Sequence, residues 1–446
     1  MRLLNFFRGE TFARGVHPPQ HKETAELPIR RLPFAPRLIV PLSQHVGRPA
    51  RPLVQVGQEV VRGEPIAAAE GFISVPHHAP ASGVIEAIRL HPTADGLWAE
   101  SIIIRVHAAS SQEVLWSRPR DLTQLDAEGL IHAVQDTGIV GLGGGVFPTH
   151  AKLRVPKQTV IDTLVVNGCE CEPYLTSDYR IMVEHADDLV AGVRIARQLL
   201  GGPRAIIGVE DNKPAAVAAI KSLLPDDGSI RVEAVPTKYP QGAGEMLIKT
   251  LTGREVPPDS RSYQVGAYVQ NVATLAGMGR LMPRGEGFIE RVITVVGTAV
   301  ERPGNYLVPL GTPLRFLLDY VGARDESIEV IFGGPMMGQA IASLDAPIIK
   351  GVAGILVFRG RDLPTQQTRK TYPCIKCGEC IESCPMGLNP STLGMLAVKR
   401  EYESMADRYR LGACFECGSC TYVCPANIPL VQHFRIAKSV LRGRAS

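Results

Sequence analysis

Two nearly identical cysteine motifs lie close to the end of this chain of 446 residues. Each motif reads C-x2-C-x2-C-x3-C-P, and every cysteine of the second lies 40 positions after its counterpart in the first. Thiolates at this spacing are typical ligands of [4Fe–4S] clusters, which carry single electrons. The repeat therefore predicts a module that holds two such clusters.

The fourth cysteine of each motif leads into a helix, so we expect it to reach the cluster of the other motif. The first cluster is then assigned to Cys374, Cys377, Cys380 and Cys424, and the second to Cys414, Cys417, Cys420 and Cys384. Zinc is the alternative, but zinc sites rarely combine three evenly spaced cysteines with a fourth before proline. Helical patterns over 393–411 and 431–444 favour a helical ferredoxin.

The overall composition narrows the class of protein. Eight of the ten cysteines lie in the motifs, which favours a reducing compartment and metal chemistry over disulfides. A net charge of +4 is small for this length and makes no case for nucleic acid. The chain opens without a recognisable leader and has no run of about 18 apolar residues, so we expect a soluble protein.

A glycine-rich stretch, GLGGGVFPTHAK at 141–152, is the first candidate for a nucleotide site. Its glycines let backbone N–H groups approach a phosphate, Lys152 adds a positive charge, and Phe147 offers a face for stacking. The glycines are Gly141, Gly143, Gly144 and Gly145. The stretch matches neither the Rossmann fingerprint nor the P-loop, and alone it is more often a flexible turn than a site.

Polar residues follow a predicted buried strand, TLVVN, in the sequence NGCECEPY at 167–174. The carboxyl end of a parallel strand is where ligands bind, so Asn167, Glu170 and Glu172 are candidates for contacts to a flavin and to ribose hydroxyls. Cys169 and Cys171 flank them, and we interpret them as buried packing, with a redox role as the alternative.

Two later stretches are weak signals when each is taken by itself. Tyr239 can stack on a ring and Gly242 permits close backbone approach, in YPQGAGEM. AYVQNVATLAGM, at 267–278, contributes Asn271 and Thr274 before a predicted helix.

The chain is predicted to be a multidomain α/β protein. Short β segments over 37–110 resemble the barrel-sandwich fold of lipoyl and biotinyl carrier domains but lack a carrier lysine, and strands alternate with helices over 120–285, including one long helix over 179–200. This alternation indicates a parallel, Rossmann-like sheet. We expect an N-terminal extension at 1–36, a β-grasp module of the SLBB kind at 286–362, a linker at 363–373 and the helical ferredoxin at 374–446.

The four stretches, in this order, resemble the flavin- and NADH-binding subunit of respiratory complex I and of related NAD-linked hydrogenases. The whole chain, with GGPMMG at 333–338 and the tandem cysteine motifs, resembles the family of C subunits of Rnf (Rsx) electron-transport complexes. Three positions depart from the complex I pattern: Cys169 replaces Asp, Ala243 and Gly244 replace paired Glu with Glu245 one position further, and Gln270 replaces Asn.

The resemblance implies that FMN and NADH share one pocket and that two [4Fe–4S] clusters carry electrons onward. By position, the four glycines and Lys152 would hold the FMN phosphate and ribityl chain, and Phe147 would stack on a ring of NADH. Residues lining flavin and NADH would be Asn167, Glu170, Glu172, Tyr239, Gly242 and Asn271.

The expected function is that of an NADH:acceptor oxidoreductase subunit, of the translocase class, lying peripherally on the cytoplasmic face of the bacterial inner membrane. Its expected partners are integral membrane subunits and an iron–sulfur subunit that meets ferredoxin or flavodoxin. The alternatives are an iron–sulfur relay that has lost nucleotide binding and a scaffold with structural clusters.

Overall fold

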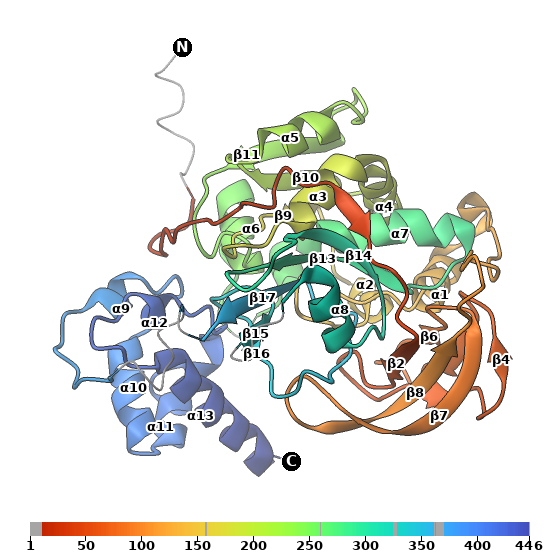
Figure 1. Ribbon diagram of the computed structural model, residues 1–446. Helices are drawn as coiled ribbons and strands as arrows, with labels where there is room; N and C mark the ends of the chain where they lie inside the picture. Colours follow the sequence, from red (N-terminus) through yellow and green to blue (C-terminus); the bar gives the residue numbers. More distant parts are fainter. Residues whose placement is uncertain are drawn as a thin grey trace.

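The computed structural model describes residues 11–156, 158–258, 260–323, 328–360, 362 and 370–445 (Figure 1). Most of the segment inspected for a leader, and residues 363–369 of the expected linker, lie outside these ranges. The C-terminal helices form a separate body beside the rest of the molecule, and the N-terminal barrel lies on the opposite side (Figure 1).

The N-terminal barrel consists of two small antiparallel sheets that enclose their own apolar core. The first sheet has the order β2 (Arg37–Pro41), β8 (Trp98–Val106), β7 (Gly83–Pro92) and β4 (Glu59–Val60). The second has the order β3 (Arg51–Pro52), β5 (Pro65–Ala68) and β6 (His77–His78). Buried Leu38, Ile85 and Ile104 fill the space between them, as alternating apolar residues of short strands predict.

The central module is built on a four-stranded parallel sheet. Its strands, in spatial order, are β11 (Ile230–Val235), β10 (Arg204–Glu210), β9 (Thr163–Gly168) and β12 (Ala267–Asn271). The helices around it are α1 (Ala127–Asp136), α2 (Thr149–Leu153), α3 (Ser177–Glu184), α4 (Ala186–Leu199), α5 (Pro214–Lys221), α6 (Gly244–Thr252) and α7 (Val272–Arg284). The alternation of strand and helix in the sequence predicted this arrangement.

The prediction of one continuous helix over 179–200 is wrong. The structure has two helices there, α3 and α4, which are separated at His185. The backbone of His185 (φ −130°, ψ 37°) lies outside the helical region, and the acidic Asp187 and Asp188 lie in the first turn of α4. Apolar spacing continues through the break, so the pattern alone did not reveal it.

The third module centres on a mixed six-stranded sheet with one helix, α8 (Leu314–Val321), against it. The strands, in spatial order, are β1 (Ile29–Arg31), β14 (Gly304–Pro309), β13 (Glu290–Val296), β17 (Gly354–Arg359), β15 (Ile328–Phe332) and β16 (Gln339–Ala340). Strand β1 comes from the expected N-terminal extension and pairs in parallel with β14. The extension is thus part of the folded structure from residue 11 onward.

The described residues of the C-terminal module form helices joined by loops and turns, with no strand among them. It contains α9 (Glu379–Glu382), α10 (Pro390–Val398), α11 (Tyr402–Asp407), α12 (Ser419–Tyr422) and α13 (Leu430–Ala445). Leu393, Met405 and Phe434 form its core. Across the described part of the whole chain, no helix combines the length and the apolar character that crossing a membrane requires.

Candidate functional site

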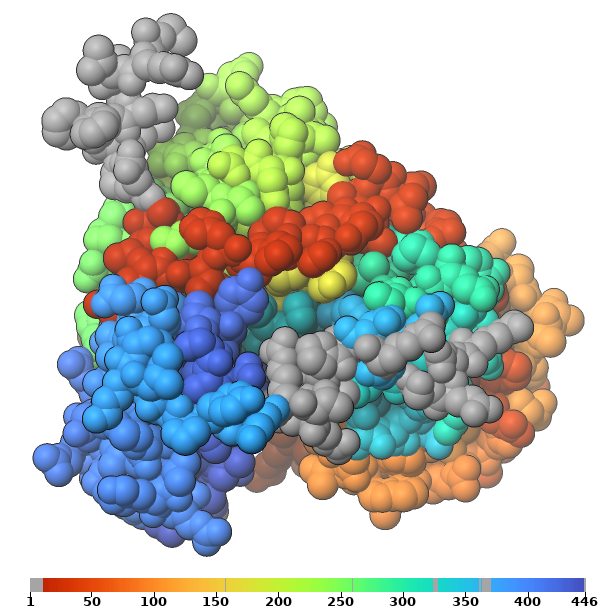
Figure 2. All heavy atoms as spheres, turned by 60° about the vertical axis from the view of Figure 1, so that its left-hand side comes forward, coloured from red at the N-terminus to blue at the C-terminus, as the bar shows by residue number. Residues whose placement is uncertain are grey.

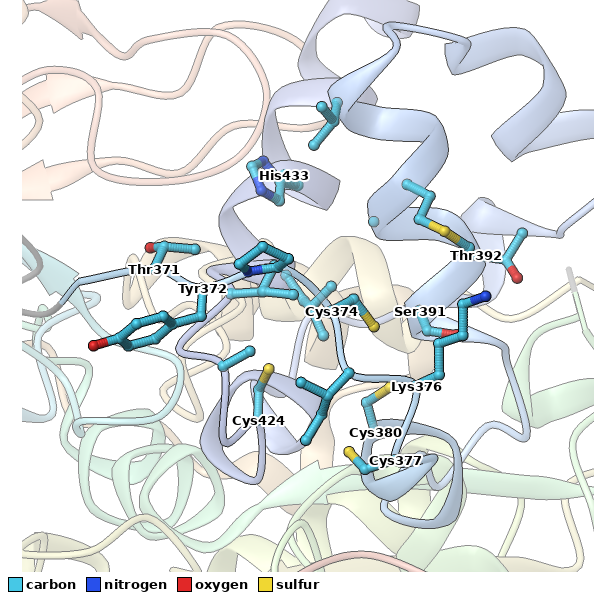
Figure 3. Close-up of a pocket in the computed structure, with 18 of the residues that line it drawn as sticks. Thr371, Tyr372, Cys374, Lys376, Cys377, Cys380, Ser391, Thr392, Cys424 and His433 are labelled. Carbon is cyan, nitrogen blue, oxygen red and sulfur yellow. The ribbon is translucent and has the colours of Figure 1, made fainter.

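The C-terminal module contains a cavity of about 550 Å³ lined by cysteines from both motifs (Figure 3). These are Cys374, Cys377, Cys380 and Cys424, and Figure 3 shows their sulfur atoms directed toward a common space. Burial raises the pKa of Cys380, and the neighbouring Cys424, Cys374 and Cys377 raise it further. Four cysteine sulfurs around one space are chemically suited to a cluster, whose iron supplies the positive charge that stabilises thiolates.

A second, tighter cavity is lined by the other four cysteines of the motifs: Cys384, Cys414, Cys417 and Cys420. Burial raises the pKa of Cys414 to about 11, and it also raises the pKa of Cys417. In the described part of the chain, no three His, Cys, Asp or Glu side chains are arranged to hold a single metal ion. The two cavities bring together the same two sets of four cysteines that the crossed assignment predicts. Ligation of a cluster by each set stays a prediction.

The predicted nucleotide residues gather at one edge of the central sheet. Asn271 ends β12, Asn167 is the last residue but one of the neighbouring parallel strand β9, and the two lie opposite each other in register. The glycine loop at 141–145 packs onto this edge, since Leu142 N–H donates to Thr274 Oγ1 at 2.9 Å and Gly143 lies against Asn271. We call this region the strand-end site: the glycine loop, the ends of β9 and β12, and the acidic turn at 167–175.

The glycine loop leaves backbone accessible at this edge. A hairpin-like pair of hydrogen bonds closes it, from Gly141 N–H to Phe147 O at 2.9 Å and from Val146 N–H to Gly141 O at 3.1 Å. Gly143, Gly144 and Gly145 are exposed, and a Cβ added at Gly144 or Gly145 would meet no atom of the described residues within 4 Å. Gly144 also has a φ of +98°, which favours glycine. An open cradle of this kind suits a phosphate-bearing ligand.

The two carboxylates of the acidic turn already have partners within the protein. Glu170 caps the start of α3, because its carboxylate accepts from Ser177 Oγ and from the backbone N–H groups of Asp178 and Tyr179, at 2.9–3.1 Å. Glu172 accepts from the N–H groups of Met336 and Met337, at 3.0 and 2.8 Å. Burial raises the pKa of Glu172 to about 7, although these two N–H groups oppose the shift.

Lys152 lies on α2 close to the carboxyl end of β12. Its ammonium donates to Val269 O at 2.6 Å and to Gln270 Oε1 at 3.1 Å, and it lies 5.3 Å from the centre of the Tyr268 ring. Burial lowers the pKa of Lys152 to about 8, and Glu245 opposes this shift. The predicted phosphate ligand is therefore at the correct edge of the sheet but is engaged with the backbone of β12.

Tyr239 and Gly242 connect the strand-end site to the second set of cysteines. Asn167 Nδ2 donates to Gly242 O at 2.8 Å, and Gly242 N–H donates to the sulfur of Cys171 at 3.3 Å. Tyr239 is 1% exposed, and it packs with Cys171 and Cys417 in one small apolar cluster. Its ring is thus part of a contact between modules and presents no open face.

Asp178 is a residue of the strand-end site that sequence reasoning did not find. Its carboxylate accepts from Asn271 Nδ2 at 2.6 Å, while Asn271 Oδ1 caps α7 by accepting from Thr274 N–H. Burial raises the pKa of Asp178 to about 7, and the neighbouring Glu170 contributes to the shift. In the sequence, Asp178 is an ordinary acidic residue in the first turn of a helix, so no pattern distinguished it.

Four family models match separate parts of the chain. They are described as the RnfC barrel sandwich hybrid domain (residues 10–109), the Nuo51 FMN-binding domain (134–280), the SLBB domain (292–340) and the 4Fe-4S dicluster domain (373–428). The expected barrel-sandwich, flavin-binding, SLBB and two-cluster modules are confirmed at this level. The cofactors are accordingly FMN and [4Fe–4S] clusters, and the open glycine cradle and the two four-cysteine cavities have the chemistry to hold them.

One solved structure with a similar fold is a chain of an NAD⁺-reducing [NiFe]-hydrogenase in the H2-reduced state. The likeness covers 71% of this chain and 63% of that one, with a TM-score of 0.50 and 22% sequence identity. At this identity the likeness shows a shared fold alone.

Curated relatives match almost the entire chain. The C subunit of the proton-translocating ferredoxin:NAD(+) oxidoreductase complex of Clostridium ljungdahlii is 41% identical over 98% of this chain and 94% of its own length. The C subunit of the ion-translocating oxidoreductase complex of Yersinia pestis is 40% identical over 97% of this chain and 69% of its length, and that of Pseudomonas aeruginosa is 42% identical over 97% and 56%. With this identity over nearly its full length, the chain belongs to the family of C subunits of the ion-translocating Rnf oxidoreductase complexes.

Proposed function

We propose that this chain is the NADH-interacting subunit of its complex, which exchanges a hydride between NAD(H) and FMN and passes single electrons through two [4Fe–4S] clusters. The observation that carries the proposal is the contact between the strand-end site and the second set of cysteines, through Tyr239 and Cys417. A nucleotide site and a cluster site joined in this way are what two-electron to one-electron transfer requires.

FMN, when bound, takes two electrons from a nicotinamide as a hydride and releases them singly, as a [4Fe–4S] cluster requires. The chain supplies position and environment. The glycine loop offers the backbone N–H groups of Gly143, Gly144 and Gly145. The side-chain amides of Asn167 and Asn271 lie at the strand ends. The third, SLBB-like module covers the acidic turn, because its Met336 N–H donates to Glu172. By position in the resemblance, Phe147 and Glu170 complete the pocket.

The two sets of cysteines have different surroundings, which suggests an order of electron flow. Cys417 contacts the central module through Tyr239, and Cys420 and Cys384 are buried. Cys374 and Cys377 are exposed. We therefore place the second cluster next to the flavin and the first at the surface where a partner accepts electrons.

The relatives' names support the wider setting. We propose that the chain lies peripherally on the cytoplasmic face of the bacterial inner membrane and acts as part of a translocase. Its partners would be integral membrane subunits and an iron–sulfur subunit that meets ferredoxin or flavodoxin. The ranges 37–110, 120–285, 286–362 and 374–446 are our proposal for its modules.

An iron–sulfur relay without nucleotide binding is the second candidate, and a specific observation favours it. Lys152, Glu170 and Glu172 all hold hydrogen bonds within the protein. Rapid mixing of NADH with protein reconstituted with FMN and clusters tests the two functions. Prompt bleaching of flavin and then of cluster absorbance is expected. A protein that carries both cofactors and does not bleach would instead be a relay.

A further inference from the structure

The N-terminal arm, residues 11–31, crosses the surface between the modules (Figure 2). Figure 2 shows it, in red, between the central module in green and the C-terminal module in blue. At one end, Gly15 N–H donates to Ser383 O at 3.2 Å, directly before Cys384. Further along, Tyr174 N–H donates to Gln20 O at 2.9 Å, and His21 stacks on Tyr174 with ring centres 4.6 Å apart.

Lys22 of this arm reaches into the acidic turn of the strand-end site. Its ammonium donates to three backbone carbonyls of that turn: Glu170 O at 2.8 Å, Glu172 O at 2.8 Å and Leu175 O at 2.6 Å. An ammonium has three N–H groups, so its donor capacity is fully used within a single turn. Burial lowers the pKa of Lys22, and the Glu170 carboxylate opposes this shift.

The carboxylates of the acidic turn bond away from the three carbonyls that Lys22 meets. Glu170 bonds to the start of α3, and Glu172 bonds to Met336 and Met337. Three carbonyls that converge on one point repel each other unless a cation lies between them, and a charged donor is the strong kind of hydrogen bond. Lys22 therefore stabilises the close approach of the Glu170, Glu172 and Leu175 carbonyls, which would otherwise repel one another.

We propose that Lys22 is a positioning residue that holds the acidic turn in the shape that the flavin site requires. Through Lys22, the N-terminal arm connects this turn to the second set of cysteines. This inference rests on the proposed function of the strand-end site. The second tie is the antiparallel pairing of Val16 with Tyr239, whose hydroxyl reaches Cys417. One arm thus contacts the turn, the Tyr239 loop and the segment before Cys384.

The test compares two lysines of the same interface. Lys22→Met removes the three bonds to the turn. Lys238→Met is the matched control, because Lys238 Nζ donates to Phe12 O at 2.8 Å and lies 4.4 Å from the centre of the Phe12 ring. Among the described residues it therefore bonds to the arm and not to the acidic turn. Lys22→Gln, which keeps two of the N–H donors, is expected to lie between wild type and Lys22→Met.

Three measurements on cluster-loaded protein are used. FMN affinity is expected to fall by roughly tenfold to a hundredfold in Lys22→Met, and by much less in Lys238→Met. The midpoint potential of bound FMN is expected to shift to a lower value, because a nearby positive charge has gone. Alkylation of Cys169 and Cys171, both buried at this turn, is expected to become faster in Lys22→Met, as read by mass spectrometry.

The outcomes separate this inference from the proposed function. Lys22→Met with wild-type FMN affinity and wild-type alkylation would overturn the role of Lys22 while leaving the flavin site intact. Equal losses in Lys22→Met and Lys238→Met would also overturn it, since the cause would then be undocking of the arm. Wild-type protein that binds no FMN would contradict the proposed function instead, and alkylation would still test whether Lys22 holds the turn.

Discussion

The phenolic hydroxyl of Tyr239 donates a hydrogen bond of 2.6 Å to the backbone carbonyl of Cys417. Tyr239 belongs to the loop that ends at α6 of the central module, and Cys417 lies in the second cysteine motif, 178 positions later. The bond therefore joins the loop beside the strand-end site to a cysteine loop of the C-terminal module.

Tyr239→Phe is expected to weaken the contact between the central and C-terminal modules without loss of FMN or of the clusters. Loss of one hydrogen bond lowers the free energy of unfolding by about 0.5–1.5 kcal/mol, and reduction of the clusters by NADH should slow in rapid-mixing experiments. Tyr268→Phe is the control: Tyr268 is buried, and its hydroxyl has no hydrogen-bond partner among the described residues. Equal rates of cluster reduction in wild type and Tyr239→Phe would show that electron transfer does not depend on this contact.

Crossed ligation predicts which cysteine substitutions damage the same cluster. Cys384→Ala and Cys414→Ala should damage the same cluster, whereas Cys424→Ala should damage the other one, because Cys384 and Cys414 line one cavity and Cys424 the other. Iron content and electron paramagnetic resonance of the three variants provide the measurement. Loss of different clusters in Cys384→Ala and Cys414→Ala would falsify the crossed assignment.

Lys152 predicts a pH dependence of FMN binding. Lys152→Ala removes a charge-assisted contact to phosphate, so FMN affinity near pH 7 should fall roughly tenfold to a hundredfold. Burial lowers the pKa of Lys152 to about 8, so in free protein the ammonium is charged below pH 8 and neutral above it. Attraction to the phosphate is present at pH 7 and fades as the pH rises through 8.

Titration of FMN affinity between pH 7 and 9 checks this sign. Wild-type affinity should decrease over that range, and Lys152→Ala should show a flatter profile. A variant that retains wild-type affinity at pH 7 would place the phosphate away from Lys152.

Association with a membrane is predicted to depend on partner subunits. Three of the four Arg and Lys side chains of α13 form ion pairs within the protein: Arg435 and Lys438 with Glu416 at 3.2 and 3.0 Å, and Arg444 with Glu403. Paired charges offer less attraction to anionic lipid, so the isolated protein should not sediment with protein-free liposomes at physiological salt. Glu416→Gln, which frees two cations, should bind liposomes more than wild type does. Strong binding by wild type would make α13 a membrane anchor.

The sequence by itself determined those features that depend on local spacing. Cysteine spacing and the 40-residue repeat predicted two four-cysteine sets, and the structure brings Cys424 to the first set and Cys384 to the second. Alternating strands and helices predicted the parallel sheet, and ligands bind at the carboxyl ends of such strands, so Asn167 was expected at a site. These inferences need only a short segment and a general rule, whereas Asn271 was assigned to the site by the family resemblance.

Only the tertiary structure decided which partners these residues meet. Glu172 bonds to residues 164 and 165 positions away, Tyr239 contacts the cysteine loop, and Asp178 reaches Asn271. Lys22 reads as an ordinary polar residue of an extension, yet its ammonium meets carbonyls 148 to 153 positions further along. Such contacts arise from how modules pack. No local period or spacing encodes them, because a hydrogen bond depends on where the folded chain brings two groups, whatever their separation in sequence.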